Sequence, residues 1–317
     1  MTDTVGALGE AAVLARILPH FRGGSAVTLG PGDDCAVVEF SGASVVTADT
    51  MIEGHDFRLD WTQPEELGWK LAMTNLSDVV AMGAVPVALT IALACPDDTE
   101  VSLLEGIAQG MQNALDLVAP GCAVAGGDLA HASELVCAVT ALGDLRGEAP
   151  VKRSGARVGD QVAYAGELGL STLGLAALFA HGPEAREFAP REVRAQLAPV
   201  TPIASGLQAG AFHATAMMDV SDGLSLDAAR LGRASGVTID LDGAALTRHF
   251  GVQDGVVVSL RALLHSGEDH GFLATFPKEQ PVPPGFCPIG TVRERGEALL
   301  VNGEPVQPAG WDPFQNR

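Results

Sequence analysis

A chain of 317 residues is long enough for about two domains, and its 47% hydrophobic content can fill more than one core. With 39 acidic and 19 basic residues, its formal net charge of −20 repels a phosphate backbone and disfavours nucleic-acid binding. The five cysteines form no C-x-x-C pair, and no apolar run reaches the ~18 residues of a membrane span. We therefore expect a soluble, cytoplasmic protein with neither disulfides nor membrane association.

Hydrophobic periodicity and turn residues predict helices and strands mixed along the whole chain. In the first half we expect helices at 6–18, 62–82 and 99–118, and strands at 35–40, 44–47, 85–93, 122–125 and 135–142. In the second half we expect strands at 162–165, up to 220 and at 237–241, with helices at 171–179, 202–212 and 224–234. The Gly- and Pro-rich stretch 143–159 predicts a junction between domains 1–148 and 149–317.

Two local signals mark element ends. Thr62 is expected to cap the second helix, with Glu65 reaching back to it. Asn302-Gly303 accepts positive φ angles, so it predicts a tight hairpin turn after the strand at 298–301.

Aspartates gather beside glycine or hydroxyl residues in five segments. They are Asp33, Asp34, Asp49, Asp78, Asp128, Asp219 and Asp222. Any one of them alone is typical of a capped turn, but the set favours a site for Mg²⁺, Ca²⁺ or Mn²⁺, because these cations prefer oxygen ligands. The histidines form no zinc-protease pattern, and no lysine-containing phosphate loop is present. If the protein binds ATP, metals and backbone amides must therefore hold it, in place of a phosphate loop.

An ordered series of motifs resembles the thiamine-monophosphate kinase family, within the aminoimidazole ribonucleotide synthetase-like (PurM-like) superfamily. The most specific is the segment 75–86, which reads N-L-S-D-V-V-A-M-G-A-V-P. The others are G-D-D-C-A-V at 32–37, T-A-D at 47–49, G-G-D at 126–128, R-S-G-A at 153–156, D-V-S-D-G-L at 219–224 and G-E-D at 267–269. The series spans nearly the whole chain.

The resemblance implies a two-domain α+β PurM-like fold. Its N-terminal α/β domain binds ATP and Mg²⁺ and forms a dimeric sheet or barrel interface, and its C-terminal domain is α+β. It also implies a homodimer with ATP near the interface. The implied reaction transfers phosphate directly from ATP to thiamine monophosphate on several Mg²⁺ ions, giving thiamine diphosphate without a covalent enzyme intermediate.

Site residues carried over by motif position fall into three groups. The metal ligands implied are Asp33, Thr47, Ala48 (through its backbone), Asp49, Asp78, Asp128, Asp219 and Asp222. The ATP contacts implied are Gly127, Asp128, Arg153 and Ser221. The substrate contacts implied are Glu268, Trp311 or Phe314, and either His55 or Asp56.

The chain departs from the family's motifs at two positions. The family's E-G-V-H-F is Glu53-Gly54-His55-Asp56-Phe57 here, so Asp56 stands in the histidine's register. In a strand, a shift of one residue reverses the face, so a local bulge is expected to bring His55 back to the substrate; Asp56 as the contact is the alternative. A family tyrosine that contacts ATP aligns with Ala108, and the single tyrosine of the chain is Tyr164.

Two other functions compete with this interpretation. The chain could be another ATP-dependent PurM-like enzyme, although it lacks the early reactive cysteine of selenophosphate synthetases and the C-terminal cysteine of hydrogenase-maturation members. It could also be a non-catalytic nucleotide-binding relative, although every metal-ligand aspartate is retained. The apolar strand at 85–93 needs cover on both faces, which predicts a dimer, or otherwise a central strand buried within one subunit.

Overall fold

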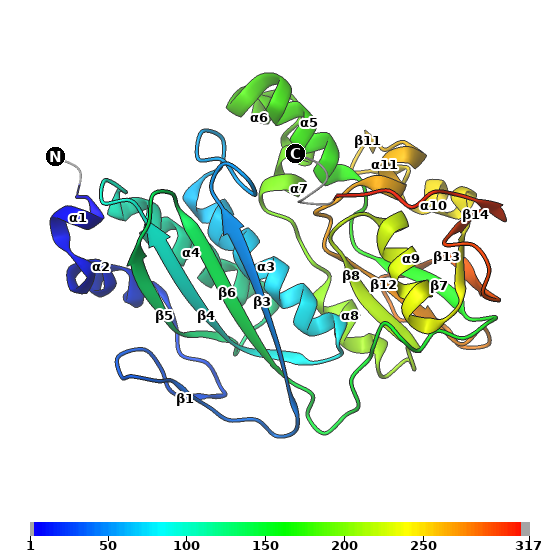
Figure 1. The fold of residues 1–317 in the computed structure, drawn as a ribbon, viewed down its shortest axis with the longest axis horizontal. Coiled ribbons are helices and arrows are strands. Elements are labelled where there is room, and N and C mark those ends of the chain that lie inside the picture. The colour runs from blue at the N-terminus through cyan, green and yellow to red at the C-terminus, as the bar shows by residue number, and fades with distance from the viewer. Residues whose placement is uncertain (1–2, 312–317) are drawn as a thin grey trace. The chain divides into compact units, whose positions relative to one another are not determined.

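The structure is a computed structural model that describes residues 3–311, and its elements gather into two compact units (Figure 1). Among the described residues, unit 1 contains 3–79 and 84–148, and unit 2 contains 80–83 and 149–311. Both units combine helices with a β-sheet. No helix within residues 3–311 is long and apolar enough to cross a membrane.

The N-terminal segment differs from the single helix expected at 6–18. It forms α1 (Val5–Leu8), α2 (Glu10–Ile17) and the short 3-10 helix η1 (Leu18–His20). Gly9, with φ of +74°, separates α1 from α2, because that backbone angle lies outside the right-handed helical region. The strand expected at 35–40 is also shorter, since only β2 (Val37–Val38) forms and pairs with β1 (Val27–Leu29).

A four-stranded sheet forms the centre of unit 1. Its strands are β3 (Ser44–Ile52), β6 (Val136–Asp144), β4 (Val85–Cys95) and β5 (Ala123–His131), in the order β3-β6-β4-β5. All pairs are antiparallel except β4 and β5, which are parallel and joined through α4 (Val101–Val118). The four strands expected here are confirmed, and each ends later in the sequence than expected.

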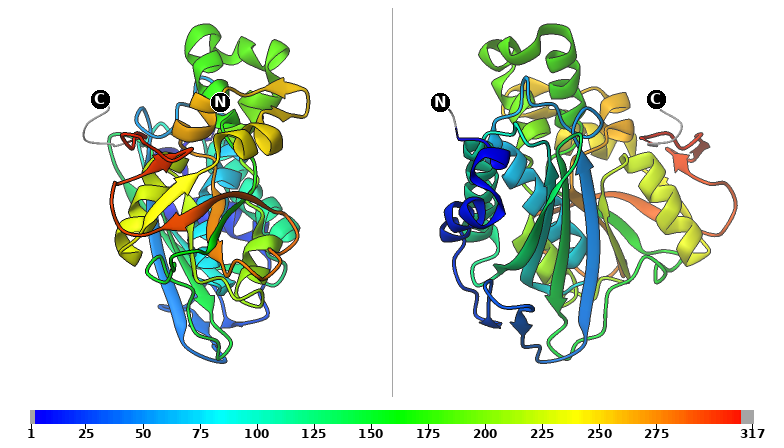
Figure 2. Two further views of the ribbon diagram at one scale, coloured as in Figure 1. Left: turned by 90° about the vertical axis from the view of Figure 1, so that its right-hand side faces the viewer. Right: turned by 60° about the vertical axis from the view of Figure 1, so that its left-hand side comes forward.

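Helices α3 (Pro64–Ala81) and α4 cover one face of this sheet (Figures 1 and 2). The two helices approach closely because Gly68 and Gly110 have no side chain; a Cβ on Gly110 would lie 2.0 Å from the Glu65 carbonyl oxygen. The expected cap of α3 is wrong by one residue. The N–H of Gln63 donates to Glu66 Oε2 at 2.9 Å, whereas the buried Thr62 hydroxyl has no hydrogen-bond partner among the described residues.

The opposite face of the sheet, which we call the open face, is exposed or half-exposed within the chain. Strand register assigns to it small or apolar side chains from three strands: Val46, Ala48 and Thr50 of β3; Val136, Ala138 and Thr140 of β6; and Thr90, Ala92 and Ala94 of β4. On the edge strand β5 the same rows end in Gly126, Asp128 and Ala130. Beyond these rows, the β1–β2 hairpin packs on the sheet around Ala88 and Leu142. Strand β4 is thus an inner strand. Its side chains that face α3 and α4 are buried, and its other face is partly exposed.

Unit 2 is built on a seven-stranded sheet in the order β15-β14-β9-β13-β7-β12-β8. The strands are β7 (Gln161–Ala165), β8 (Ala216–Val220), β9 (Thr238–Leu241), β12 (Gly271–Phe276), β13 (Phe286–Arg293), β14 (Leu300–Val301) and β15 (Glu304–Pro305). The hairpin predicted from Asn302-Gly303 is confirmed, with φ angles of +55° and +80° between β14 and β15.

Several helices and a small hairpin surround this sheet. They are α5 (Leu170–His181), η2 (Gly182–Glu184), α6 (Ala185–Phe188), α7 (Pro190–Leu197), α8 (Ile203–Ala209), α9 (Leu224–Ser235), α10 (Gly243–Phe250) and α11 (Leu260–His265), with β10 (Val252–Gln253) and β11 (Val256–Val257). The helix expected at 202–212 is shortened to α8. The strands β12 and β13 are inner strands of the sheet, although the sequence pattern did not predict them.

Candidate active site

A cavity of about 680 Å³ in unit 1 brings together residues that the motifs assign to ATP and metal binding. Asp33 comes from the loop 30–36, and Gly127 and Asp128 come from β5. The rest of the lining near the N-terminus is apolar: Leu14 and Ile17 of α2, Leu18 of η1, and Phe21. One end of the cavity therefore offers carboxylates and glycine backbone, and the other offers side chains that suit a flat apolar group.

Two neighbouring glycines in the cavity wall differ in how much space surrounds their backbone. A Cβ on Gly127 would lie 2.1 Å from the carbonyl oxygen of Ile91, so the close pairing of β4 and β5 requires glycine there. A Cβ on Gly126 would meet no heavy atom within 4 Å, so this glycine borders open space. Its bare backbone leaves room for a ligand to approach the strand.

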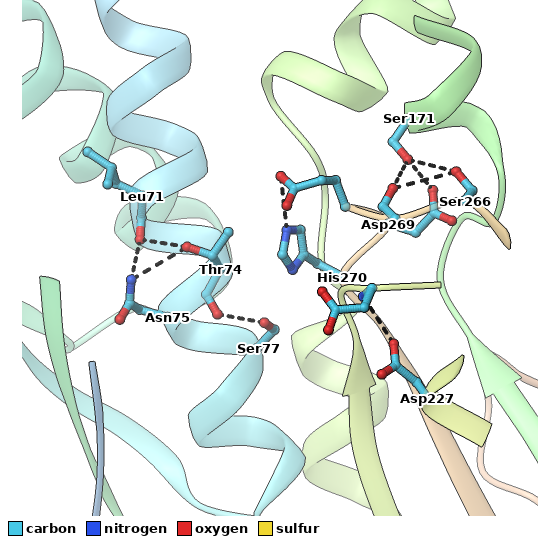
Figure 3. Close-up of polar contacts among 12 residues, drawn as sticks. Leu71, Thr74, Asn75, Ser77, Ser171, Asp227, Ser266, Asp269 and His270 are labelled. Carbon is cyan, nitrogen blue, oxygen red and sulfur yellow. Dashed lines mark hydrogen bonds and ion pairs between the residues drawn. The ribbon is translucent and has the colours of Figure 1, made fainter. Parts of the chain in front are cut away.

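A second group of predicted ligands lies along β3. The Thr47 hydroxyl donates to Asp78 Oδ2 at 2.8 Å, which joins the end of α3 to the sheet, and Asp49 Oδ1 accepts the N–H of Thr50 at 2.8 Å. In the same helix, Asn75 and Ser77 bond back to carbonyls of the preceding turn (Figure 3). Of the polar residues in the N-L-S-D segment, Asp78 is the one hydrogen-bonded to β3.

These two groups occupy opposite edges of the unit 1 sheet. The register aligns Asp49 with Val139 of β6, then Ile91 of β4, then Gly127 of β5. Three strand spacings separate the ends of this row, which is roughly 14 Å at about 4.8 Å per spacing. Asp49 and Asp128 of one copy of this unit therefore cannot ligate the same ion.

The segment that carries His55 and Asp56 is a turn, so the expected strand geometry is wrong. Strand β3 ends at Ile52, Gly54 has φ of +81°, and both His55 and Asp56 are exposed. The carboxylate of Asp56 accepts the N–H of Ile52 at 2.8 Å and closes the turn. Because both residues lie in a turn, neither strand alternation nor a bulge in a strand can determine which of the two side chains contacts a substrate.

In unit 2, backbone hydrogen bonds join two of the motif segments and Trp311. The N–H of Glu268 donates to the Ser221 carbonyl at 2.7 Å, and the N–H of Trp311 donates to the Asp222 carbonyl at 2.8 Å. Asp219 lies in β8 just before this loop and is buried. Trp311 is 43% exposed. The predicted substrate contacts Glu268 and Trp311 thus border the predicted metal and ATP residues of this unit, whereas Phe314 lies outside the described residues.

An ion-pair network surrounds Asp222. The Arg230 guanidinium contacts Asp222, and it contacts the buried Asp227 at 2.8 Å. Burial, and secondly the charge of Asp222, raises the pKa of Asp227 to about 6. Arg230 was not among the sequence-predicted site residues, and its charge balances part of this acidic pair.

The loop of the G-E-D motif is strained. Glu268 and His270 have φ of +65° and +50°, a region that costs L-residues about 1–2 kcal/mol each. Between them the buried Asp269 accepts the N–H of Gly169 at 2.8 Å and lies 2.7 Å from the Ser171 hydroxyl (Figure 3). Burial raises the pKa of Asp269 to about 7 against the lowering effect of these hydrogen bonds. Its place beside Glu268 in the motif was the only sequence signal for it.

The backbone of Arg153 lies away from the other predicted site residues of unit 2. Its carbonyl accepts the Ser235 hydroxyl at 2.7 Å, at the C-terminal end of α9, whereas Ser221 and Asp222 precede the N-terminal end of that helix. The twelve residues of α9 span roughly 18 Å.

The tyrosine position of the family has no counterpart in the cavity. Ala108 is buried within α4, and Tyr164 is buried in β7, where its hydroxyl donates to the Glu167 carbonyl at 2.7 Å. Among the residues lining the unit 1 cavity, the aromatic side chain is that of Phe21.

The donor chemistry fits a hard cation, because the predicted ligands are carboxylates and a threonine hydroxyl, and Asp33, Asp49 and Asp128 are exposed. Across residues 3–311, however, no group of three or more His, Cys, Asp or Glu is placed to hold a metal ion. Each unit therefore carries only part of the predicted set of metal ligands.

Comparison with known proteins identifies the family. Residues 32–145 match the family model of the AIR synthase related protein, N-terminal domain. The chain is 39% identical to the thiamine-monophosphate kinase of Mycobacterium tuberculosis, over 99% of this chain and 94% of that protein. The chain belongs to the thiamine-monophosphate kinase family.

Solved structures of the family agree with this membership. The thiamine monophosphate kinase from Aquifex aeolicus matches with a TM-score of 0.76 and 32% identity, over 85% of this chain and 91% of that one. A ThiL structure complexed with AMPPCP, an ATP analogue, and TMP matches with a TM-score of 0.75 and 32% identity, over 98% and 99% of the two chains. The predicted family and its α+β PurM-like fold are confirmed, and the family is one of kinases that act in thiamine biosynthesis.

Proposed function

We propose that this protein transfers the terminal phosphate of ATP to thiamine monophosphate, giving ADP and thiamine diphosphate. The observation that carries the proposal is the family membership over nearly the full chain, together with a relative complexed with an ATP analogue and TMP. The unit 1 cavity supplies a matching chemistry in this chain, since it combines Asp33, Asp128 and an open glycine backbone with an apolar end.

ATP would bind in that cavity with its phosphates at Gly126, Gly127 and Asp128. Backbone amides beside bare glycines can approach phosphate oxygens closely, which a chain without a phosphate-loop lysine requires. The adenine would meet the apolar end, where Phe21 offers the aromatic surface that the family tyrosine supplies elsewhere. Ser221 and Arg153 stay predicted ATP contacts, and the length of α9 separates them within unit 2.

Three groups of residues would hold Mg²⁺ ions. Asp33 and Asp128 form the group at one edge of the unit 1 sheet, and Asp219 and Asp222 form the group in unit 2. The group at the other sheet edge consists of Thr47, Asp49, Asp78 and the backbone of Ala48. Bound there, the cations would neutralise the repulsion between donor and acceptor phosphates and support direct in-line transfer. The acceptor phosphate is an anion at neutral pH, so the protein needs no strong general base. Its own contribution is to orient the two anions and to keep them in line.

The acceptor would be recognised in unit 2 by Glu268 and Trp311. A carboxylate attracts the cationic thiazolium ring, and the half-exposed indole can stack on it. His55 and Asp56 stay candidates for a further substrate contact, and Phe314 stays a prediction.

A homodimer through the open face would complete this arrangement. On β3, β6 and β4 that face carries small or apolar, partly exposed side chains, and the carboxylate of Asp128 lies at its β5 edge, so its larger part has the composition of a surface that a second copy covers. The same sheet carries predicted ligands on both edges, which gives a dimer two sets of each group near its interface.

The test is ADP formation measured with and without thiamine monophosphate in the presence of Mg²⁺. Formation of ADP and thiamine diphosphate that depends on both substrates supports the proposal. ADP formation that needs another acceptor would point to a different PurM-like enzyme, and ATP binding without turnover would point to a non-catalytic relative. Location in the cytoplasm and the lack of a nucleic-acid partner stay predictions.

A further inference from the structure

Asp269 lies where it can hold the Glu268 loop without reaching a substrate. It is 5% exposed, and the serine it meets, Ser171 at the start of α5, is fully buried. On either side of it, Glu268 and His270 have left-handed backbone angles, which residues other than glycine rarely adopt. Such a conformation persists only where surrounding contacts fix it, and Asp269 is the side chain that ties this loop to α5.

A count of protons shows which form of Asp269 satisfies these contacts. The Ser171 oxygen lies 2.5 Å from the Gly267 carbonyl oxygen and 2.7 Å from Asp269 Oδ1. Both are hydrogen-bonding distances between oxygens, so each needs a proton, and a serine hydroxyl has one. The neighbouring Ser266 hydroxyl donates to Thr172 Oγ1 at 2.7 Å, so it does not supply the second proton.

A protonated Asp269 satisfies the contacts with Ser171 Oγ and Gly169, and its oxygens keep lone pairs for the backbone N–H of Ser171, which also bonds to this carboxyl. Its Oδ1–H donates to Ser171, Ser171 donates to the Gly267 carbonyl, and Oδ2 accepts the N–H of Gly169 at 2.8 Å. An ionised Asp269 would instead leave two oxygen lone pairs facing each other across one of the short contacts. The N-terminus of α5 favours the anion, but burial opposes it more strongly and raises the pKa of this carboxyl.

We propose that Asp269 is a positioning residue that works as a neutral carboxylic acid. It donates a hydrogen bond to Ser171 and thereby locks the strained loop 267–270, which presents Glu268 beside Ser221. This inference rests on the proposed function in one respect, namely that Glu268 faces the thiamine side of the acceptor. The neutral hydrogen-bonded acid itself stands on the geometry of unit 2 alone.

The decisive variant is Asp269→Asn, which keeps the shape of a neutral acid and can donate through its amide to Ser171. We expect its KM for thiamine monophosphate to stay within about threefold of the wild type. Asp269→Ala and Ser171→Ala remove the lock, so each should raise that KM at least tenfold with the KM for ATP unchanged. Thr172→Val is the matched control, because it removes a hydroxyl from the same cluster without touching Asp269 or Gly267. It should change thermal stability but not KM.

An Asp269→Asn variant that loses acceptor affinity as severely as Asp269→Ala would overturn the proposal, since an anion would then be required. An unchanged KM in Ser171→Ala would overturn it as well, and this variant carries the test if Asp269→Ala does not fold. If the wild type shows no turnover with thiamine monophosphate, the proposed function fails by itself. Infrared spectroscopy then decides the rest: a carboxylic-acid C=O band present at slightly acidic pH must disappear in Asp269→Asn.

Discussion

Alanine substitutions at the adjacent Gly126 and Gly127 should separate ligand binding from folding. In Gly127→Ala the new Cβ would lie 2.1 Å from the Ile91 carbonyl oxygen, whereas real Cβ atoms essentially never come within 3.0 Å of such an atom. The strands β4 and β5 must therefore move apart by about 0.9 Å. Overpacking of this kind costs about 1–3 kcal/mol, which lowers Tm by about 2–4 °C per kcal/mol.

Gly126→Ala should behave in the opposite way. The new Cβ meets nothing within 4 Å, and the φ angle at this position is not positive. The free energy of unfolding should therefore stay the same or rise by about 0.4–1 kcal/mol, because alanine lowers the conformational entropy of the unfolded chain. The methyl group would project into the space where phosphate is proposed to bind, so affinity for AMPPCP should fall at least tenfold, or about 1.4 kcal/mol.

Scanning calorimetry measures the stability of both variants, and titration calorimetry with AMPPCP and Mg²⁺ measures binding. Wild-type affinity in a stable Gly126→Ala variant would refute the placement of ATP phosphates at this strand. Wild-type stability of Gly127→Ala would refute the steric reasoning itself.

Three further outcomes are expected. Asp49→Asn and Asp128→Asn, on opposite sheet edges, should each lower kcat at least a hundredfold, about 3 kcal/mol, with unchanged Tm; near-normal turnover in both would defeat the metal assignment. Ala92→Glu, on the open face, should convert a dimer to a monomer by light scattering, while Leu117→Glu at an exposed position of α4 should not; a monomeric wild type at micromolar concentration would remove the dimer proposal. The pKa of Asp269 is raised to about 7 from the ordinary value of 3.8, so between these pH values the native protein keeps a proton that the unfolded chain releases. The contribution of this group to the free energy of unfolding is therefore full below about pH 4 and is lost as pH rises to about 7. The pH profile of Tm should therefore fall less steeply over that range in Asp269→Asn, and identical profiles would contradict the assignment.

Elements whose cause is local could be predicted well. The Asn302-Gly303 turn depends on two residues that tolerate positive φ, and the helix at 64–81 depends on its own periodicity and on a proline in its first turn. The strands β12 and β13 were not predicted, because each is defined by hydrogen bonding to a neighbouring strand on either side. Tertiary pairing, and not local alternation of side chains, determines them. For the same reason, His55 and Asp56 were assigned to a strand that in fact ends three residues earlier.

The sequence by itself determined the family, because the order of short motifs along a chain is a property of the sequence alone. It also determined the residue types of the site, since carboxylates beside glycine indicate hard cations wherever they lie. Only the tertiary structure decided how these residues are grouped. The order β3-β6-β4-β5 separates Asp49 from Asp128 by three strand spacings, and Asp269 meets Ser171 across 98 residues of chain. Proximity between residues so far apart follows from how sheets and helices pack, and a linear pattern does not carry that information.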